Sequence, residues 1–559
     1  MFMKKKMLLI LITLVLSLSV LFTSCVVKDN EELETKSTEN IEEKTEDPLV
    51  NPPGRFPVCK EKITMTVGMP MHPNVKDYET NELTKWLKEK TNIDFVFDLY
   101  TSSEATQKLQ MMIAGGAQLP EVVLGISFTN LEIASFANQG TIVPLTEYYE
   151  KYGLWTKEML SKANNDKLKE LLTAPDGNIY VIPKYAEQLG NEWSLRSWIN
   201  KSWLDNLGLE MPRTTDDFYS VLKAFKTNDP NGNVSEDEIP FVGSRNGWRQ
   251  QTYDFILNAF IYNDTINRYI VNDGKLDVAY NKTQWRDGLK YLNKLTSEEL
   301  MSPLSFTQNN QQFKQMFGTS GPATIGVFTA GSTAAVLGAT DERIAQYEPL
   351  PPLKGPDGDE WAAHFPTMPF NFFIVTKECK HPLAAFLWGD LMLSEESAMR
   401  SRWGVPGVDW LEPVAGEKGM YENMGYKAKL KPILPWGSAQ NSHWNEMNPT
   451  FRTFEFADGQ VWNGNILDGE YRVSMSVPLY IGKAPKEIVY DLIFTEAEVG
   501  QITEINSNLK NYVQDNIVRF STGDRRIESE WDAYVNEFEK LGLKQYLEIS
   551  QKAYDRMNQ

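Results

Sequence analysis

The chain has 559 residues, of which 42% are apolar and 23% are charged, a globular mixture long enough for more than one compact domain. Its formal net charge is −19, whereas a nucleic-acid binder needs a basic footprint, so we expect no nucleic-acid partner. The charge is compatible with a soluble protein that works outside the cell, or with a neutral ligand.

The N-terminus predicts an export signal that ends in a lipid anchor. A basic start at 4–6 precedes the apolar run MLLILITLVLSLSVLF, and the small residues at 23–24 precede Cys25. Small residues before a cysteine resemble a bacterial lipobox, in which the cysteine is acylated, although Phe22 departs from its usual Leu. The alternative is an uncleaved transmembrane anchor. We expect a lipoprotein signal peptide at 1–24, lipidation of Cys25 and a location on the extracellular face of the cell membrane.

The next segment, residues 25–57, predicts a disordered acidic linker. It is highly charged, contains two adjacent prolines and has few apolar residues, so it cannot bury enough surface to fold. A flexible tether between a lipid anchor and a folded body is the simplest interpretation.

Two cysteines remain beyond Cys25. Cys59 begins the folded body and Cys379 lies more than 300 residues later. They form either one disulfide or two free thiols, and spacing alone cannot establish that their Cα atoms lie close enough for a bridge.

The folded body opens with a regular alternation of strands and helices. Apolar alternation predicts strands at 62–69, 92–100 and 119–125, and helical periodicity predicts helices at 81–90 and 105–114. The order β-α-β-α-β predicts a parallel sheet with helices on its faces.

Further along, a helix leads directly into a polar loop and a strand. Thr214 or Thr215 can cap a helix whose apolar residues recur at helical spacing from Phe218 to Phe225. The strand IPFVG follows the loop. A strand, a turn and a helix are predicted at 371–393. The C-terminus is helical, at 503–520 and 528–557, and its apolar faces need a partner surface.

The polar loop NDPNGNVSEDEIP, residues 228–240, places oxygen-bearing side chains at alternate positions. These are Asp229, Asn231, Asn233, Ser235 and Asp237, followed by Glu238. The register matches positions 1, 3, 5, 7 and 9 of an EF-hand loop, but position 12 is Pro240, so Glu238 at position 10 is the only nearby substitute. A self-sufficient turn is the alternative, because Asx and Gly residues favour turns. Repulsion among the carboxylates favours a structural Ca²⁺.

Residues 195–243 resemble extracellular solute-binding proteins of family 1, the substrate-capturing lipoproteins of carbohydrate ABC importers. The resemblance is carried by Trp203-Leu204-Asp205, Leu207-Gly208-Leu209, Pro212 and the DPNGN…DEIP tail. Alginate-oligosaccharide-binding proteins carry a similar loop that holds calcium, which implies calcium on the six loop residues named above. Weaker similarity extends to 136–153, to 403–410, where Pro406 replaces the family's Glu, and to 531–557.

The resemblance implies an α/β, two-lobed periplasmic-binding-protein type II fold with a ligand cleft between the lobes and extra C-terminal helices. Because the chain crosses between lobes more than once, each lobe is discontinuous. We expect the first lobe at 58–190 and 345–400, and the second, with the calcium loop and C-terminal helices, at 191–344 and 401–559.

A carbohydrate site needs flat aromatic rings against the C–H face of the sugar and polar groups at its rim. Trp in polar or Gly/Pro-rich loops is the best candidate, with packing at a lobe surface as the alternative. The candidates are Trp248 with Asn246 and Arg249, then Trp403, Trp410, Trp436 and Trp444. Trp86, Trp203, Trp285 and Trp531 fall on helical patterns and are expected in the core.

The predicted function is capture of an oligosaccharide or other carbohydrate and its delivery to the membrane subunits of an ABC permease, by a protein expected to be monomeric. A polysaccharide-active enzyme and a surface adhesion lipoprotein are the alternatives. The four histidines are scattered, no HExxH, G-x-S-x-G or P-loop motif is present, and no internal repeat is visible. We therefore expect a binding protein without enzymatic activity.

Overall fold

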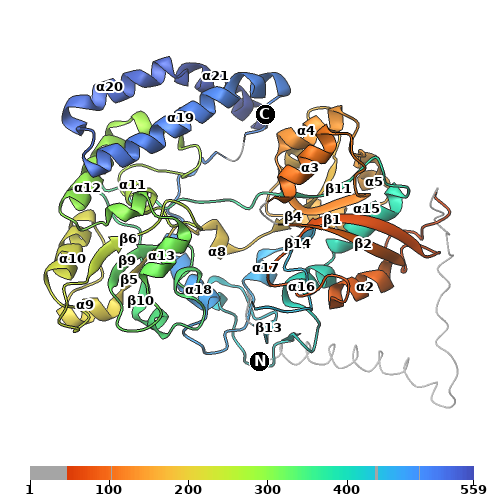
Figure 1. Ribbon diagram of the computed structural model, residues 1–559, viewed down its shortest axis with the longest axis horizontal. Helices are drawn as coiled ribbons and strands as arrows, with labels where there is room; N and C mark the ends of the chain where they lie inside the picture. The colour runs from red at the N-terminus through yellow and green to blue at the C-terminus, as the bar shows by residue number, and fades with distance from the viewer. Residues whose placement is uncertain (1–46, 102–103, 435–437, 490–491, 559) are drawn as a thin grey trace, which may run out of the picture. The chain divides into compact units, whose positions relative to one another are not determined.

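The computed structural model describes residues 47–101, 104–434, 438–489 and 492–558 (Figure 1). The predicted signal peptide, the predicted lipidation site Cys25 and the candidate Trp436 lie outside these ranges. Within them, no helix is both long and apolar enough to cross a membrane.

The predicted β-α-β-α-β opening forms one half of a six-stranded sheet. Its strand order is β14-β4-β11-β3-β1-β2, with β1 parallel to β2 and β3, and β11 antiparallel to β3 and β4. The strands are β1 (Ile63–Pro70), β2 (Ile93–Tyr100), β3 (Val122–Phe128), β4 (Val181–Ala186), β11 (Phe370–Val375) and β14 (Thr450–Arg452). The helices in this part of the chain are α2 (Glu82–Thr91), α3 (Ala105–Ala114), α4 (Asn130–Asn138), α5 (Thr146–Lys151), α6 (Trp155–Lys162), α7 (Leu168–Leu172), α15 (Pro382–Met392) and α16 (Glu395–Trp403).

A second sheet of four strands has the order β10-β5-β9-β6. The strands are β5 (Ser197–Asn200), β6 (Ile239–Val242), β9 (Ile325–Thr329) and β10 (Tyr347–Leu350). Near it lie α8 (Leu189–Glu192), α9 (Lys201–Leu207), α10 (Thr215–Thr227), α11 (Thr252–Leu257), α13 (Asn310–Met316), α14 (Ala334–Leu337) and α18 (Gly469–Tyr480), with the small strand pair β7 (Tyr269–Asn272) and β8 (Lys275–Val278). The short helix α17 (Phe454–Ala457) follows β14 of the first sheet and lies beside it (Figure 1), and β12 (Trp410–Leu411) pairs with β13 (Lys431–Pro432). Each large sheet packs against its own apolar core, which gives two α/β lobes.

The chain passes between the two sheets several times. It crosses from β4 to β5, returns from β10 to β11, and reaches the first sheet again at β14. The observed sheets therefore differ from the expected lobe boundaries at two strands. β10 joins the second sheet by pairing with β5, and β14 joins the first by pairing with β4.

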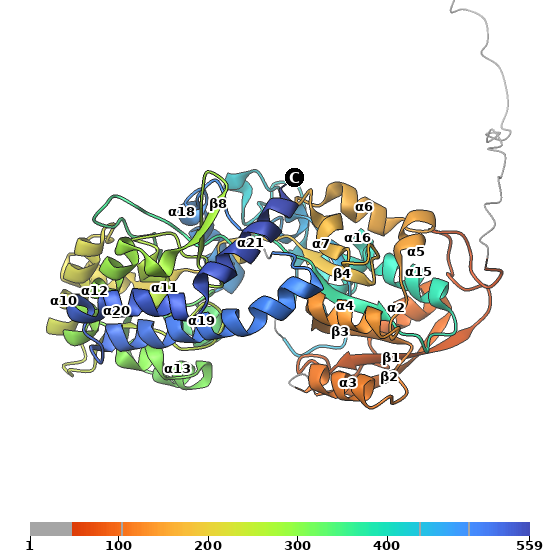
Figure 2. The ribbon, with the colours of Figure 1, turned by 90° about the horizontal axis from the view of Figure 1, so that it is seen from above.

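The C-terminal helices pack on the second lobe, as their apolar faces predict. They are α19 (Glu496–Thr522), α20 (Ile527–Lys540) and α21 (Leu543–Met557), and α19 and α20 contact α12 (Thr283–Ser297) (Figures 1 and 2). Leu509 and Val513 of α19 are buried in the same core as Trp285 of α12. This confirms that Trp285 is a core residue.

Part of the predicted linker belongs to the folded body. Val50 is fully buried and pairs with Cys59, and the Asn51 backbone N donates to the carbonyl of Val58 over 2.8 Å. The Phe56 ring stacks on Trp155 with 6.2 Å between centroids. The expectation of disorder up to residue 57 is therefore wrong for residues 47–57, because isolated apolar side chains in this acidic segment find partners on the first lobe.

The cysteine alternatives are resolved in favour of two free thiols. Cys59 and Cys379 are both buried and unbridged. Burial is the main cause that raises the pKa of each thiol to about 11, so both are protonated at neutral pH.

Candidate functional site

A cavity of about 480 Å³ lies among the segments that connect the two sheets. It contains two of the predicted ligand residues, Trp248 and Arg249. An adjoining cavity of about 600 Å³ shares Trp248, Arg249 and Ile266 with it. The side chains that line the first cavity come from β4, from the crossings at 186–194 and 364–370, from the loops after β6 and α11, and from α16 and β14. The cavity is thus assembled from segments far apart in the sequence.

Aromatic rings reach this cavity from both lobes. Trp248, in the loop after β6, is 44% exposed, and Phe370, the first residue of β11, is 52% exposed. The Trp248 ring covers Gly331, where a Cβ atom would lie only 2.4 Å from the ring. The Gly331 backbone N also donates to the carbonyl of Trp248 over 3.0 Å. Glycine at 331 therefore lets the indole lie flat with one face exposed.

Arg249 is held beside Trp248 by three contacts. Its Nε donates to Ser194 Oγ over 3.1 Å and its Nη1 donates to Thr265 Oγ1 over 3.5 Å. Its guanidinium carbon lies 3.3 Å from the centroid of the Phe365 ring, a cation–π contact. The backbone of Arg249 has φ of 56°, a left-handed conformation that a side chain disfavours, so surrounding contacts fix its position.

The loop after α11 is shaped by one carboxylate. Asp264 Oδ1 accepts from the backbone N of Ile266, Asn267 and Arg268 at 2.8, 3.0 and 2.6 Å. These bonds hold Thr265 at φ 69° and Arg268 at φ 57°. The Asp264 carboxylate is therefore engaged with its own loop while it lines the cavity.

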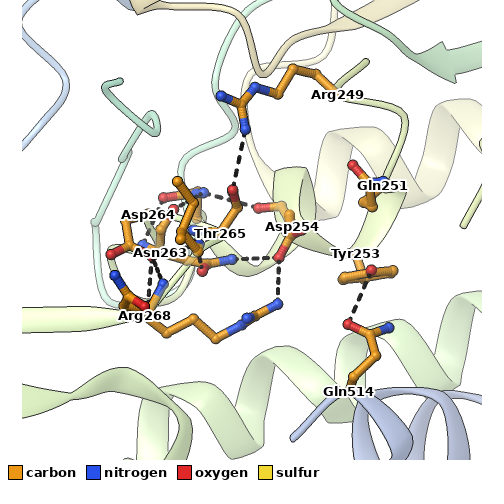
Figure 3. Close-up of polar contacts among 12 residues, drawn as sticks. Arg249, Gln251, Tyr253, Asp254, Asn263, Asp264, Thr265, Arg268 and Gln514 are labelled. Atoms are coloured by element: carbon orange, nitrogen blue, oxygen red, sulfur yellow. Dashed lines mark hydrogen bonds and ion pairs between the residues drawn. The ribbon is translucent and has the colours of Figure 1, made fainter. Parts of the chain in front are cut away.

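A second carboxylate is enclosed behind that loop (Figure 3). Asp254 Oδ1 accepts from Asn263 Nδ2 over 2.8 Å and lies 3.4 Å from Arg268 Nη2. Tyr253, next to it in α11, donates its hydroxyl to Gln514 Oε1 of α19 over 3.3 Å. These contacts tie the cavity wall to the C-terminal helices.

A buried ionic cluster lies on the first-lobe side of the cavity. Glu446 is 5% exposed, forms an ion pair with Arg452, and lies 3.1 Å from Arg402 Nη1 and 3.6 Å from Lys184 Nζ. Burial disfavours its charge, but the three cations outweigh burial and hold the pKa of Glu446 well below its usual range. Arg402 also lies 3.6 Å from Glu470.

The other predicted aromatic residues do not line this cavity. Trp403 is buried, with the guanidinium carbons of Arg402 and Arg452 each 5.3 Å from its ring centroid. Trp410 is half-buried and donates its indole N–H to the carbonyl of Gly404 over 3.2 Å.

Trp444 and Asn246 are also placed elsewhere. Trp444 is fully buried in the first-lobe core and donates to Thr84 Oγ1 over 2.9 Å, which corrects the expectation that it contacts ligand. Asn246 lies two residues from Trp248, and its Oδ1 accepts from the backbone N of Asn310 over 2.9 Å. It lines neither of the two adjoining cavities.

Several residues at the cavity escaped the sequence analysis. They are Lys184, Phe365, Phe370, Arg402, Glu446 and Arg452. Phe370 carried one usable signal, because it opens an apolar strand directly after the Pro-containing crossing FPTMP. The charged residues carried none, since only the fold brings β4, α16 and β14 together.

The predicted calcium loop folds around its own oxygen atoms. The Asp229 carboxylate accepts from the backbone N of Asn233 and Val234 at 3.1 and 2.9 Å, and Asn231 Oδ1 accepts from Asn233 N at 3.0 Å. Asp237 accepts from the side-chain amides of Asn231 and Asn233 at 3.1–3.2 Å. The side chains at alternate positions thus bond to one another and to the backbone of the loop.

One carboxylate oxygen of the loop, Glu238 Oε1, is buried and has no hydrogen-bond partner. Burial, with repulsion from Asp237 and Asp229, raises the pKa of Glu238. A cation would satisfy this oxygen, although across the ranges that the structure covers no three His, Cys, Asp or Glu side chains converge as a metal-binding group.

The two α/β lobes, the repeated crossings and the cavity between the sheets define a solute-binding protein. The model of the bacterial extracellular solute-binding protein family matches residues 72–399, and the chain belongs to this family. Membership confirms the resemblance, the two-lobed fold and the prediction of a binding protein rather than an enzyme.

Among its relatives is the fructooligosaccharide ABC transporter substrate-binding protein FusA of Streptococcus pneumoniae, 28% identical over 90% of this chain and 91% of FusA. The polygalacturonan/rhamnogalacturonan-binding protein YtcQ of Bacillus subtilis is 24% identical over 89% of this chain and 92% of its own length. A solved structure of a FusA EF-hand mutant in complex with fructo-nystose covers 89% of this chain and 99% of that chain, with 25% identity and a TM-score of 0.72.

Proposed function

We propose that this protein captures an oligosaccharide in the cavity that contains Trp248, Arg249 and Phe370, and delivers it to the membrane subunits of an ABC importer. The observation that carries the proposal is the pair of exposed aromatic rings, one from each lobe, beside a rim of charged and amide groups. Closure of the two lobes around the ligand would mark the loaded state for the permease.

The geometry suits a sugar for a simple energetic reason. A pyranose or furanose ring has an apolar C–H face, and covering about 60–80 Å² of it contributes roughly 1.5–2 kcal/mol per aromatic platform. Asn191, Asn267 and Thr367 offer hydrogen-bonding groups at the rim. Two platforms and several rim bonds are enough for micromolar affinity after the cost of association.

The names of the relatives support the same ligand class. FusA is a fructooligosaccharide-binding protein and YtcQ a polygalacturonan/rhamnogalacturonan-binding protein, so both recognise chains of sugar units. Because both cover nearly the whole of this chain, we extend that ligand class to it.

Isothermal titration calorimetry with a panel of oligosaccharides tests the proposal. We expect at least one to bind with micromolar or better affinity, and Trp248→Ala to weaken that binding. Trp462→Ala is the matched control, because Trp462 is also exposed but stacks on Tyr471 away from the cavity. The proposal fails if no oligosaccharide binds, or if the two variants lose the same affinity.

We further propose that the loop at 228–240 holds a structural Ca²⁺. Asp229, Asn231, Asn233, Ser235, Asp237 and Glu238 would supply its oxygen ligands. The buried, unpartnered Glu238 Oε1 supports this, as does the EF-hand that was mutated in the related FusA structure. Calorimetric titration of chelator-treated protein with CaCl₂ should give one site per chain, and an absence of heat would contradict it.

The anchor completes the proposal. Lipidation of Cys25 would tie the protein to the extracellular face of the membrane, with the segment before residue 47 as its tether. In cells fed labelled palmitate, we expect label in the native protein and none in Cys25→Ser.

Light scattering of the soluble body should give the mass of one chain, because we expect a monomer.

A further inference from the structure

We propose that the ligand carries an anionic group, such as a uronate carboxylate, which binds between Arg249 and Lys184. This inference rests on the proposed function and narrows its ligand class to acidic oligosaccharides.

The first observation is the sign of the charge at the cavity. Its lining includes four cations, Lys184, Arg249, Arg402 and Arg452, and two carboxylates, Asp264 and Glu446, a net formal charge of +2. The chain as a whole carries −19. Long-range repulsion from the acidic surface works against an anionic ligand unless the site itself attracts it. The positive charge of the cavity supplies that attraction.

The second observation concerns the charge of Arg249. Of the residues that the structure describes, no carboxylate lies within ion-pairing distance of its guanidinium; its hydrogen bonds go to two hydroxyls. Figure 3 shows why the neighbouring carboxylates do not pair with Arg249. Asp254 interacts with Asn263 and Arg268, and Asp264 accepts hydrogen bonds from its own loop.

Burial of Arg249 therefore carries an electrostatic cost. Loss of hydration lowers the pKa of Arg249 to about 10, although Asp254 and Asp264 act in the opposite direction. A carboxylate from the ligand would offset that cost directly. The guanidinium lies against the Phe365 ring and is held by two hydroxyls, and its planar fork suits two parallel bonds to a carboxylate.

The third observation is the surplus of positive charge at Lys184. Lys184 shares Glu446 with Arg452 and Arg402, and its Nζ donates to the backbone carbonyl of Glu446 over 3.2 Å. Even with Glu470 counted as a partner of Arg402, this cluster holds three cations and two carboxylates. Burial, with repulsion from Arg452 and Arg402, lowers the pKa of Lys184 despite the attraction of Glu446.

The test compares acidic oligosaccharides with uncharged ones. Calorimetry would use trigalacturonate, its fully methyl-esterified form, trimannuronate, sialyllactose, and neutral fructo- and malto-oligosaccharides. We expect an acidic oligosaccharide to bind at least tenfold more tightly than its ester or its neutral counterpart. Raising NaCl from about 0.05 to 0.5 M should weaken only the acidic ligand.

Two variants locate the effect. Arg249→Gln and Lys184→Gln should each weaken the acidic ligand by about 10- to 100-fold, and should weaken a neutral or esterified ligand by a smaller factor. Arg245→Gln is the control, because Arg245 is an exposed cation four residues from Arg249 in the same loop, outside the cavity lining.

The outcomes separate the two proposals. If neutral oligosaccharides bind as tightly as acidic ones, or only neutral ones bind, the anionic inference is overturned and the oligosaccharide function stands. If no saccharide of either kind binds, the function itself fails.

Discussion

The loop at 228–240 and the cavity between the sheets are both concentrations of polar groups, but they are built in opposite ways. The loop gathers its oxygens from one stretch of thirteen residues that bond to one another. The cavity gathers cations and aromatic rings from β4, α16, β11 and β14 and from loops of the second lobe. The loop is acidic and lies at the surface, whereas the cavity is cationic and partly enclosed.

The loop is built by contacts between neighbours in sequence, whereas the cavity is built by tertiary contacts. A loop whose ligands are neighbours in sequence needs only its own turns to bring them together. The cavity exists only when two sheets have formed and the chain has crossed between them. Damage to the loop should therefore stay local, while damage to the ionic cluster should affect the stability of the body.

The largest effect is expected from Glu446→Gln. This change leaves Lys184, Arg402 and Arg452 close together without their shared carboxylate. Removing one partner of a buried ion pair lowers the free energy of unfolding by about 3–5 kcal/mol. Urea unfolding followed by Trp fluorescence measures the loss. Glu455→Gln removes an exposed partner of Lys429 and should cost under about 1 kcal/mol. Equal losses in the two variants would contradict a stabilising cluster.

The stability of the protein should depend on pH through the same residue. Because the pKa of Glu446 is lower in the folded than in the unfolded state, its contribution to stability is fully present above about pH 4.5. That contribution is lost as the pH falls towards the folded-state pKa. The native protein should lose more stability between about pH 5 and 3 than Glu446→Gln does, as seen in melting temperatures, and parallel curves would argue against the assignment.

Calcium removal should have the next largest effect. An ion held at about 100 times its dissociation constant stabilises by about 2.7 kcal/mol, so chelation should lower the melting temperature. Asp229→Ala should abolish this response to chelator. Glu236→Ala is the matched control, because it removes one charge from the same loop at an exposed position outside the alternate register. A chelator response that survives in Asp229→Ala would place the ion elsewhere.

Phe370→Ala should act on affinity rather than stability. Loss of one ring face costs roughly 1.5–2 kcal/mol of binding, or about 10- to 30-fold in the dissociation constant. Phe56→Ala removes another exposed ring, 41% accessible, that stacks on Trp155 instead, and should leave affinity unchanged. If calorimetry finds Phe370→Ala as tight as the native protein, the platform from the first lobe does not contact the ligand.

These contrasts also explain what the sequence could predict. The alternation in 62–125 predicted the three parallel strands β1, β2 and β3, because local periodicity follows from a buried face, but it did not predict their order in the sheet. The pairing of β14 with β4 and of β10 with β5 left no local signal, so both strands were assigned to the other lobe. Trp248 was predicted because its loop is polar, but Trp444 lies in an equally polar loop and is buried against Thr84.

The smallest effect concerns the helix that leads into the loop. Thr214 Oγ1 accepts from Asp217 N at 3.0 Å, and Asp217 Oδ2 accepts from Thr214 N at 3.1 Å, a capping box at the start of α10. Thr214→Ala should cost about 1 kcal/mol in urea unfolding, and Thr214→Ser, which keeps the hydroxyl, only a few tenths. Because α10 ends where the loop begins, a weaker calcium affinity in Thr214→Ala would show that the loop depends on the helix. An unchanged affinity would show that the loop is held by its own bonds, as its internal geometry predicts.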